Sequence, residues 1–149
     1  MVFPARALSW VAATTVVAGS IQACSDARDN APPQHGLASG TASVTINGQD
    51  TGGKHAVLCN QIQWSLMIET PTPAPGFTVL IDTGPEATAK FVKIRDLGGF
   101  TGSYWRGGMG DGEATRDPDL YTVTGSAYGI HTDAPNRPTN ATYRIRAAC

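Results

Sequence analysis

Short segments of alternating apolar and polar residues, broken by turn-forming residues at roughly every 8 to 12 positions, are the feature that most constrains the fold. Seventeen glycines and ten prolines among 149 residues, with no long helical periodicity, indicate many turns. About eight short strands of this kind predict an all-β fold, either an antiparallel sandwich or a partly open barrel. Nine candidate segments supply these strands: residues 43–46, 56–59, 62–69, 77–82, 90–95, 100–105, 112–116, 120–127 and 142–146.

The clearest local prediction is a hairpin at Asn47-Gly48, since this dipeptide is the strongest cue for a two-residue turn between strands. It follows the alternating segment 43–46. We therefore expect Val44 and Ile46 to point into the core.

Three further local expectations follow from the residue pattern. Alternation in the last segment places Tyr143 and Ile145 on one face. The proline-rich residues 71–76 forbid a ladder and predict a loop. The one place where we expect a helical turn is residues 84–87.

Cys24 ends a stretch with the pattern of a bacterial lipoprotein signal. Arg6 precedes the apolar residues 7–21, and small Ala23 stands just before the cysteine. A helix of residues 7–21 would be about 22 Å long, short of the roughly 30 Å hydrocarbon core of a membrane. The pattern favours cleavage and lipidation of Cys24, and the alternative is an ordinary secretory signal with Cys24 left as a thiol.

This pattern gives a three-part organisation of the chain. Residues 1–23 are expected to form the signal peptide, residues 24–42 the lipidated cysteine and a flexible linker, and residues 43–149 the all-β domain. The linker contains a single large aliphatic residue, Leu37, which is too little apolar area to offset the entropy of ordering.

The two remaining cysteines, Cys59 and Cys149, are expected to form a disulfide, because an even pair outside the cytoplasm normally oxidises. Such a bridge closes a long loop and stabilises by about 4 to 5 kcal/mol. A metal site is the alternative, but the cysteines have no CxxC spacing and no histidine at ligand spacing.

The remaining polar residues do not form a recognisable catalytic pattern. The exported part carries a formal charge of about −2, which argues against nucleic acid as a partner. We expect His35, His55 and His131 to be solvent-facing loop residues, with no metal and no cofactor. The aspartates lie near turns, where this residue caps the local backbone, and Ser126 sits one place too early for a nucleophile elbow.

The most suggestive surface candidate is a binding loop made of Tyr104, Trp105 and Arg106, followed by the glycine-rich residues 107–112. Aromatic residues and arginine are enriched at recognition hot spots. The simpler and favoured interpretation is that Trp105 ends a strand and packs under the loop, while the glycines make a bulged connection.

The residues also support a family resemblance. The segments that carry it are 44–50, 57–59, 121–129 and the ending from Asn136 to Cys149. In their order and spacing, the domain resembles the mycobacterial lipoprotein antigen family typified by the 19 kDa antigen LpqH. Three features depart from that pattern. The linker is poorer in threonine and serine than the family's glycosylated linker, and neither the loop of residues 71–76 nor the Tyr104-Trp105 pair is typical of the family.

The resemblance implies a surface-exposed envelope antigen held on the extracytoplasmic face of the cell membrane by a lipid anchor, with a bridge between the two cysteines and no enzymatic activity. Its partners would be the membrane and either a host receptor or an envelope component. Two alternatives remain: an envelope carrier for a lipid or glycan, with a pocket lined by Trp64, Met67 and Phe77, and an inhibitor of a periplasmic hydrolase acting through the glycine-rich loop. The sequence names no ligand and no oligomeric state.

Overall fold

The computed structural model describes residues 40–149, so Cys24, the signal peptide, the linker up to residue 39 and His35 lie outside the described residues. The described part contains ten β-strands and no helix. The strands are β1 (Thr41–Ile46), β2 (Gln49–Ala56), β3 (Leu58–Ile62), β4 (Ser65–Glu69), β5 (Gly76–Asp82), β6 (Thr88–Leu97), β7 (Phe100–Trp105), β8 (Asp111–Asp117), β9 (Leu120–His131) and β10 (Thr139–Ala148).

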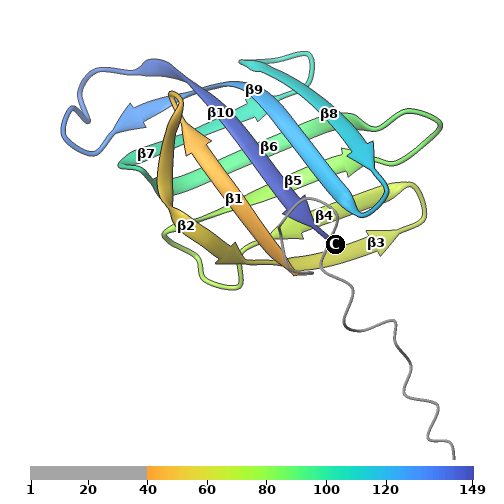
Figure 1. The fold of residues 1–149 in the computed structure, drawn as a ribbon. Helices are drawn as coiled ribbons and strands as arrows, with labels where there is room; N and C mark the ends of the chain where they lie inside the picture. Colours follow the sequence, from red (N-terminus) through yellow and green to blue (C-terminus); the bar gives the residue numbers. More distant parts are fainter. Residues whose placement is uncertain (1–39) are drawn as a thin grey trace, which may run out of the picture. The chain divides into compact units, whose positions relative to one another are not determined.

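All strand pairs are antiparallel, and nine strands follow one path in the order β2-β1-β10-β9-β7-β6-β5-β4-β3. The two ends of this path, β2 and β3, are consecutive in the chain and are joined through Val57. The sheet is therefore nearly closed into a barrel, as Figure 1 shows. The expected all-β fold is confirmed, with ten strands where about eight were predicted.

The long strand β9 divides the sheet into two layers. Along one side it pairs with β10 over ten residues, from Leu120 to Gly129. Along its other side it pairs first with β8 and then, at Tyr128–His131, with β7. One layer is thus β2-β1-β10-β9-β8 and the other is β7-β6-β5-β4-β3, and their strands cross in Figure 1.

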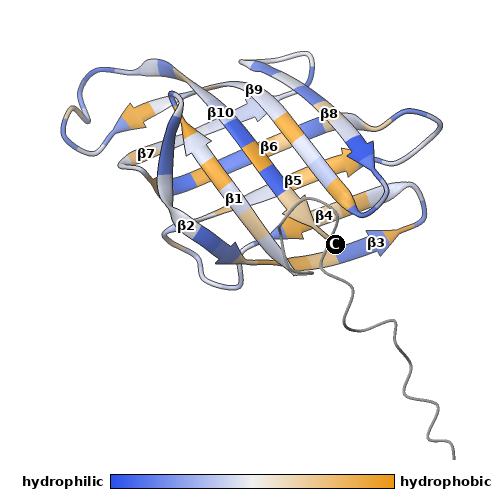
Figure 2. Ribbon diagram, in the orientation of Figure 1, coloured by the Kyte–Doolittle hydropathy of each residue, from blue (hydrophilic) through white to orange (hydrophobic). Residues whose placement is uncertain are grey.

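The core lies between these layers and comes from the inward positions of each strand. Figure 2 shows hydrophobic and hydrophilic residues alternating along the strands. Val44, Ile46, Tyr143 and Ile145 are all buried, so the alternation predicted for the first and last segments is confirmed. The largest fully buried side chains are Phe77, Phe100, Ile68, Ile81, Ile94, Leu97 and Ile145. The ten described strands, this core and the disulfide all lie within residues 40–149, which pack as one compact unit.

The hairpin at Asn47-Gly48 is confirmed, because Ile46 pairs with Gln49 across the two turn residues. Asn47 has φ 50° and Gly48 φ 78°, the left-handed values that a type I′ turn requires. The second strand, β2, begins directly after this turn, at Gln49. The prediction of a single strand at residues 56–59 was wrong, because β2 ends at Ala56 and β3 starts at Leu58.

Two other expectations need correction. Residues 62–69 do not form one strand, because a turn at Gln63-Trp64 pairs Ile62 with Ser65 and separates β3 from β4. Gln63 adopts φ 52°, which no alternation of apolar residues reveals. The expected helical turn at residues 84–87 is wrong as well, since this segment is a bend between β5 and β6. The predicted loop at residues 71–76 is confirmed up to Pro75, because β5 begins at Gly76.

Candidate functional site

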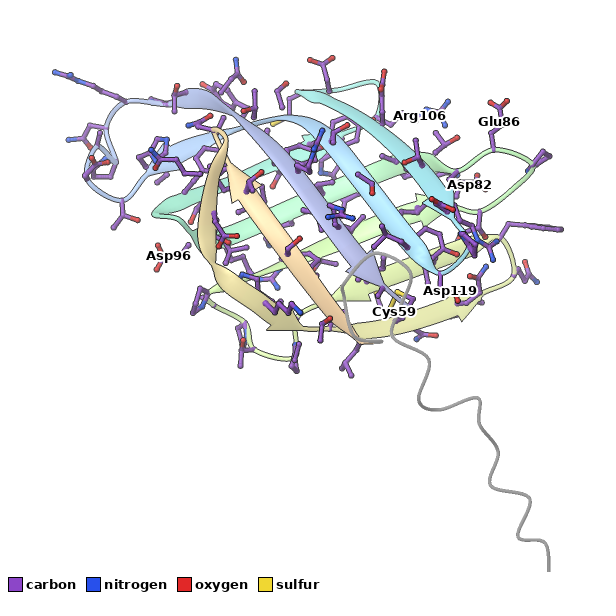
Figure 3. The ribbon with its side chains drawn as sticks, viewed as in Figure 1. Cys59, Asp82, Glu86, Asp96, Arg106 and Asp119 are labelled. Carbon is purple, nitrogen blue, oxygen red and sulfur yellow. A yellow bond between two sulfur atoms is a disulfide. The ribbon has the colours of Figure 1, made fainter. Side chains whose placement is uncertain are left out.

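A disulfide between Cys59 and Cys149 joins the two layers at one corner of the domain, with the Cα atoms 6.0 Å apart (Figure 3). Cys59 lies in β3, at the edge of the second layer, and Cys149 follows β10 of the first layer. The bridge spans 90 residues of sequence. The predicted pairing is confirmed, and the alternative of a metal site at these two cysteines is wrong.

The start of the described chain meets the same corner. The N–H of Gly40 donates to the carbonyl of Ala148 at 2.8 Å, and the N–H of Val57 donates to the carbonyl of Gly40 at 2.8 Å. Cys149 is also held by its N–H, which donates to the backbone carbonyl of Asp119 at 3.0 Å. Any segment that precedes Gly40 therefore enters the domain next to β3 and the disulfide.

The candidate loop of Tyr104, Trp105 and Arg106 divides between core and surface. Tyr104 is buried, and its hydroxyl donates to the carbonyl of Ala89 at 3.2 Å. Trp105 ends β7 as expected, but it does not pack under the loop, because 59% of its surface is exposed. Its ring meets the ring of Phe91 edge-on, at 5.3 Å between centroids. Of these three candidate residues, Trp105 and Arg106 are exposed and Tyr104 is not.

The glycines after Arg106 have structural roles. Gly107 and Gly110 adopt φ values of 78° and 75°, in the left-handed region. The Trp105 N–H donates to the carbonyl of Met109 at 3.0 Å, which closes the loop on itself. Gly112 lies against the ring of Tyr104, where a Cβ atom would come within 2.3 Å. The interpretation of a glycine-built connection agrees with these contacts.

Two exposed aspartates have lowered pKa values, and each has a local cause. Backbone N–H groups of Gly53 and Gly52 donate to the Asp50 carboxylate and lower its pKa. The Asp82 pKa is lowered first by the ammonium of Lys90 at 3.0 Å and then by the N–H of Gly84. Both carboxylates cap or pair with nearby groups, as expected for aspartates at turns.

The pKa of Tyr143 is shifted more strongly than that of either aspartate. Burial raises the pKa of this phenol far above its usual value, and the neighbouring Tyr104 and Asp111 act in the same direction. The hydroxyl donates to the carbonyl of Asp111 at 2.9 Å, so the neutral form is the one that the core holds.

The expectation that the histidines lie in loops is wrong for both of those that the structure describes. His55 lies in β2, 3.2 Å from the hydroxyl of Thr51 through Nε2. His131 ends β9 with its ring 5.2 Å from that of Phe100. Within residues 40–149, the histidine, cysteine and acidic side chains form no group of three or more that could hold a metal.

The pocket expected for a carrier is not formed by the residues named for it. Phe77 points into the core, Met67 is on the outer side of β4, and Trp64 is exposed in the turn between β3 and β4. A surface cleft of about 490 Å³ lies elsewhere, between the β5–β6 loop and β8. It is lined by Thr83, Gly84, Pro85, Glu86, Ala87, Ala114, Thr115 and Arg116.

A feature that the sequence analysis missed lies on the outer surface of the second layer. Met67 pairs with Leu80, Leu80 with Phe91, and Phe91 with Trp105, so one apolar row crosses four adjacent strands. We call Met67, Leu80, Phe91 and Trp105 the apolar row. The signal was present in the sequence as large apolar residues at positions where alternation predicts polar ones.

Ten antiparallel strands and a bridge between β3 and the C-terminal residue define a disulfide-linked all-β domain. The model of the Mycobacterium 19 kDa lipoprotein antigen family matches residues 35–149. The chain therefore belongs to this family, and it is a membrane-associated lipoprotein of the cell envelope.

Similar proteins agree with this assignment. A Mycobacterium indicus pranii protein named as a lipoprotein is 41% identical over 138 residues, covering 91% of this chain and 97% of that protein. LppE of Mycobacterium tuberculosis, also named as a lipoprotein, is 31% identical over 134 residues, covering 90% and 91%. The lipoprotein LpqH of Mycobacterium bovis is 30% identical over 115 residues, covering 76% and 72%. In residues 40–149, no helix has the length and apolar character to cross a membrane.

Proposed function

We propose that this chain is a non-catalytic, surface-exposed antigen held on the extracytoplasmic face of the cell membrane by acyl chains on Cys24. The observation that carries the proposal is the Cys59–Cys149 disulfide. The sequence has three cysteines, so this bridge leaves Cys24 as the thiol available for lipid. Two or three acyl chains on one cysteine hold a protein firmly at a membrane, whereas a single chain binds only marginally.

Two of the described carboxylates, Asp50 and Asp82, hold local structure, which supports a non-catalytic role. Asp50 and Asp82 have lowered pKa values, the opposite of what a general acid at neutral pH requires. Their partners are backbone N–H groups and Lys90, which fix turns and one strand end. The domain then acts through its surface, toward a host receptor or a component of the envelope.

Metabolic labelling with a radioactive fatty acid tests the anchor. Cells that produce the full chain should incorporate label into it, and the Cys24→Ser variant should remain unlabelled. The double variant Cys59→Ser/Cys149→Ser is the matched control, because it removes two thiols but keeps Cys24 and should still be labelled. Wild-type protein that reaches the envelope without label would refute the anchor.

A further inference from the structure

The outer surface of the second layer departs from the usual pattern of an antiparallel sheet, in which the solvent-facing side is polar. The apolar row occupies one outward position on each of β4, β5, β6 and β7. Directly opposed residues on adjacent strands lie about 4.5 to 5.5 Å apart at Cβ. The four side chains therefore form a continuous strip across the sheet.

Exposed apolar residues of the β3–β4 hairpin lie near this strip: Leu58 and Ile62 flank Asn60, the β3 residue that pairs with Met67, and Trp64 lies in the turn. Leu58, Ile62 and Trp64 have 57%, 67% and 69% of their surfaces exposed, and Trp105 at the other end of the row has 59%. Large contiguous apolar patches on a monomer mark interaction sites. We call the strip together with Leu58, Ile62 and Trp64 the outer apolar face.

The two tryptophans identify the chemistry of the occupant. Trp64 and Trp105 are the only tryptophans after residue 23, and both belong to the outer apolar face. Tryptophan is enriched where an apolar interior meets water, because its ring is apolar and its N–H is polar. At membrane surfaces it lies at the level of the lipid headgroups.

Cationic side chains lie beside the apolar row. Lys93 and Arg95 follow Phe91 at outward positions of β6, and Arg106 follows Trp105. The guanidinium of Arg95 also contacts Thr78 on β5, at 2.9 Å. Long cationic side chains beside an apolar surface are typical of contacts with anionic headgroups.

Acidic groups near this surface are partly neutralised. Asp82 is paired with Lys90, and Glu69 lies at an outward position of β4. Figure 3 shows Asp82 and Arg106 at the same end of the domain, and Arg106 contributes to the low pKa of Asp82. Lys93, Arg95 and Arg106 therefore outnumber Glu69 and Asp96, the two carboxylates of these described strands that form no ion pair with Lys or Arg.

The place where the chain enters the domain gives the position of this face relative to a membrane anchor. Gly40 bonds to Val57, which directly precedes Leu58 at the edge of the outer apolar face. The sixteen residues from Cys24 to residue 39 can span at most about 55 Å. An anchor at Cys24 therefore keeps this face within reach of the leaflet that holds the acyl chains.

We infer that the outer apolar face is a peripheral membrane-contact surface that docks the domain on an anionic lipid leaflet, which rests on the lipid anchor proposed above. The apolar row and the two tryptophans contact the interfacial region, and Lys93, Arg95 and Arg106 contact anionic headgroups. The acyl chains supply attachment, and this face supplies orientation. The first layer, with β8, β9 and β10, is then directed away from the membrane.

Residues 24–149 carrying Cys24→Ser test this surface without any acyl group. The probe is a vesicle of equal parts phosphatidylglycerol and phosphatidylcholine, compared with phosphatidylcholine alone. Because both tryptophans within residues 24–149 belong to the face, we expect a blue shift of tryptophan fluorescence and quenching by brominated lipid with the anionic vesicles. Absence of both signals would overturn the inference.

Matched single variants locate the contact. Trp105→Gln should weaken vesicle binding about tenfold in co-sedimentation, and Lys93→Glu should reduce it with anionic vesicles. Arg144→Glu is the control for Lys93→Glu, because Arg144 is an exposed cationic residue of β10 in the first layer and its reversal should reduce binding much less. Thermal unfolding of each variant checks that the domain is folded.

If a partner other than a membrane binds the outer apolar face, the same experiments give different results. Sedimentation that shows a dimer lost in Trp105→Gln, with no vesicle binding, would replace the membrane by a second copy of the chain and overturn the inference. Fatty-acid label on Cys24 together with no vesicle binding by the unacylated chain would overturn the contact surface and leave the anchor intact. Vesicle binding without label in cells would support the surface and contradict the anchor.

Discussion

The ring of Tyr104 lies directly against Gly112, so that a β-carbon at position 112 would come within 2.3 Å of the ring. The two residues stand on either side of the glycine-rich loop, Tyr104 in β7 and Gly112 in β8. The Tyr104 hydroxyl donates to Ala89 in β6. The buried Tyr104 side chain thus connects β6, β7 and β8, near the point where β9 changes partner from β8 to β7.

Gly112→Ala should destabilise the domain by about 1 to 3 kcal/mol, because the added methyl group overpacks against the Tyr104 ring. Urea denaturation followed by circular dichroism measures the change. Gly108→Ala is the control, since a Cβ there makes only an ordinary 3.5 Å contact with Trp105, and it should cost much less. Equal losses in both variants would contradict the packing role of Gly112.

Loss of the disulfide should lower the free energy of unfolding by about 3 to 5 kcal/mol, because the bridge closes a loop with a sequence separation of 90 residues. The double variant Cys59→Ala/Cys149→Ala, compared with the oxidised domain in urea, measures this. Adding a reducing agent should lower the midpoint of the wild-type protein and leave that of the variant unchanged. An unchanged midpoint in the variant would show that the bridge adds nothing to stability.

Thr70→Val should cost about 1 to 3 kcal/mol, because Phe77 loses the acceptor of its backbone N–H in a buried position. The N–H donates to the Thr70 hydroxyl at 3.1 Å, and this hydroxyl donates to the carbonyl of Thr72 at 3.2 Å. Thr70→Ser should retain most of the stability. Thr72→Val is the exposed control, and a loss as large as that of Thr70→Val would argue against the buried bond.

Stability should fall as the pH rises above about 10, the pKa of an exposed tyrosine. Burial raises the Tyr143 pKa, so the folded state keeps the proton that the unfolded state releases. The contribution is complete below pH 10 and is lost as the pH rises toward the folded pKa. Urea midpoints at increasing alkaline pH measure the slope.

Tyr143→Phe should flatten that alkaline slope and cost about 1 kcal/mol at neutral pH, because the bond to the Asp111 carbonyl is lost. Tyr128→Phe, which changes an exposed tyrosine, should keep the wild-type slope. A variant at position 143 that retains the full slope would assign the alkaline loss to other groups.

The strands that sequence could predict are those whose residues alternate strongly. Val44 and Ile46 in β1, like Tyr143 and Ile145 in β10, have polar neighbours at the outward positions, and their burial follows from the two-residue period. The disulfide followed from a count of cysteines and an export signal. Both kinds of evidence are local or compositional.

The parts that could not be predicted depend on pairing between distant residues. β2 is polar and contains Gly52-Gly53, so only its hydrogen bonds to β1 make it a strand. The hairpin at Gln63-Trp64 needs a positive φ at glutamine, a residue without turn preference. The outward position of Trp105 and the inward position of Tyr104 also required the register of β7 with β6 and β9.

β1 receives the chain at Gly40 and lies between β2 and β10, with antiparallel pairs on both sides. A pull applied through the residues that precede Gly40 acts along this strand. Such a load must shear two rows of hydrogen bonds at once, whereas a pull on an edge strand breaks the bonds of a single row. The N-terminal attachment point is therefore the mechanically resistant side of the domain.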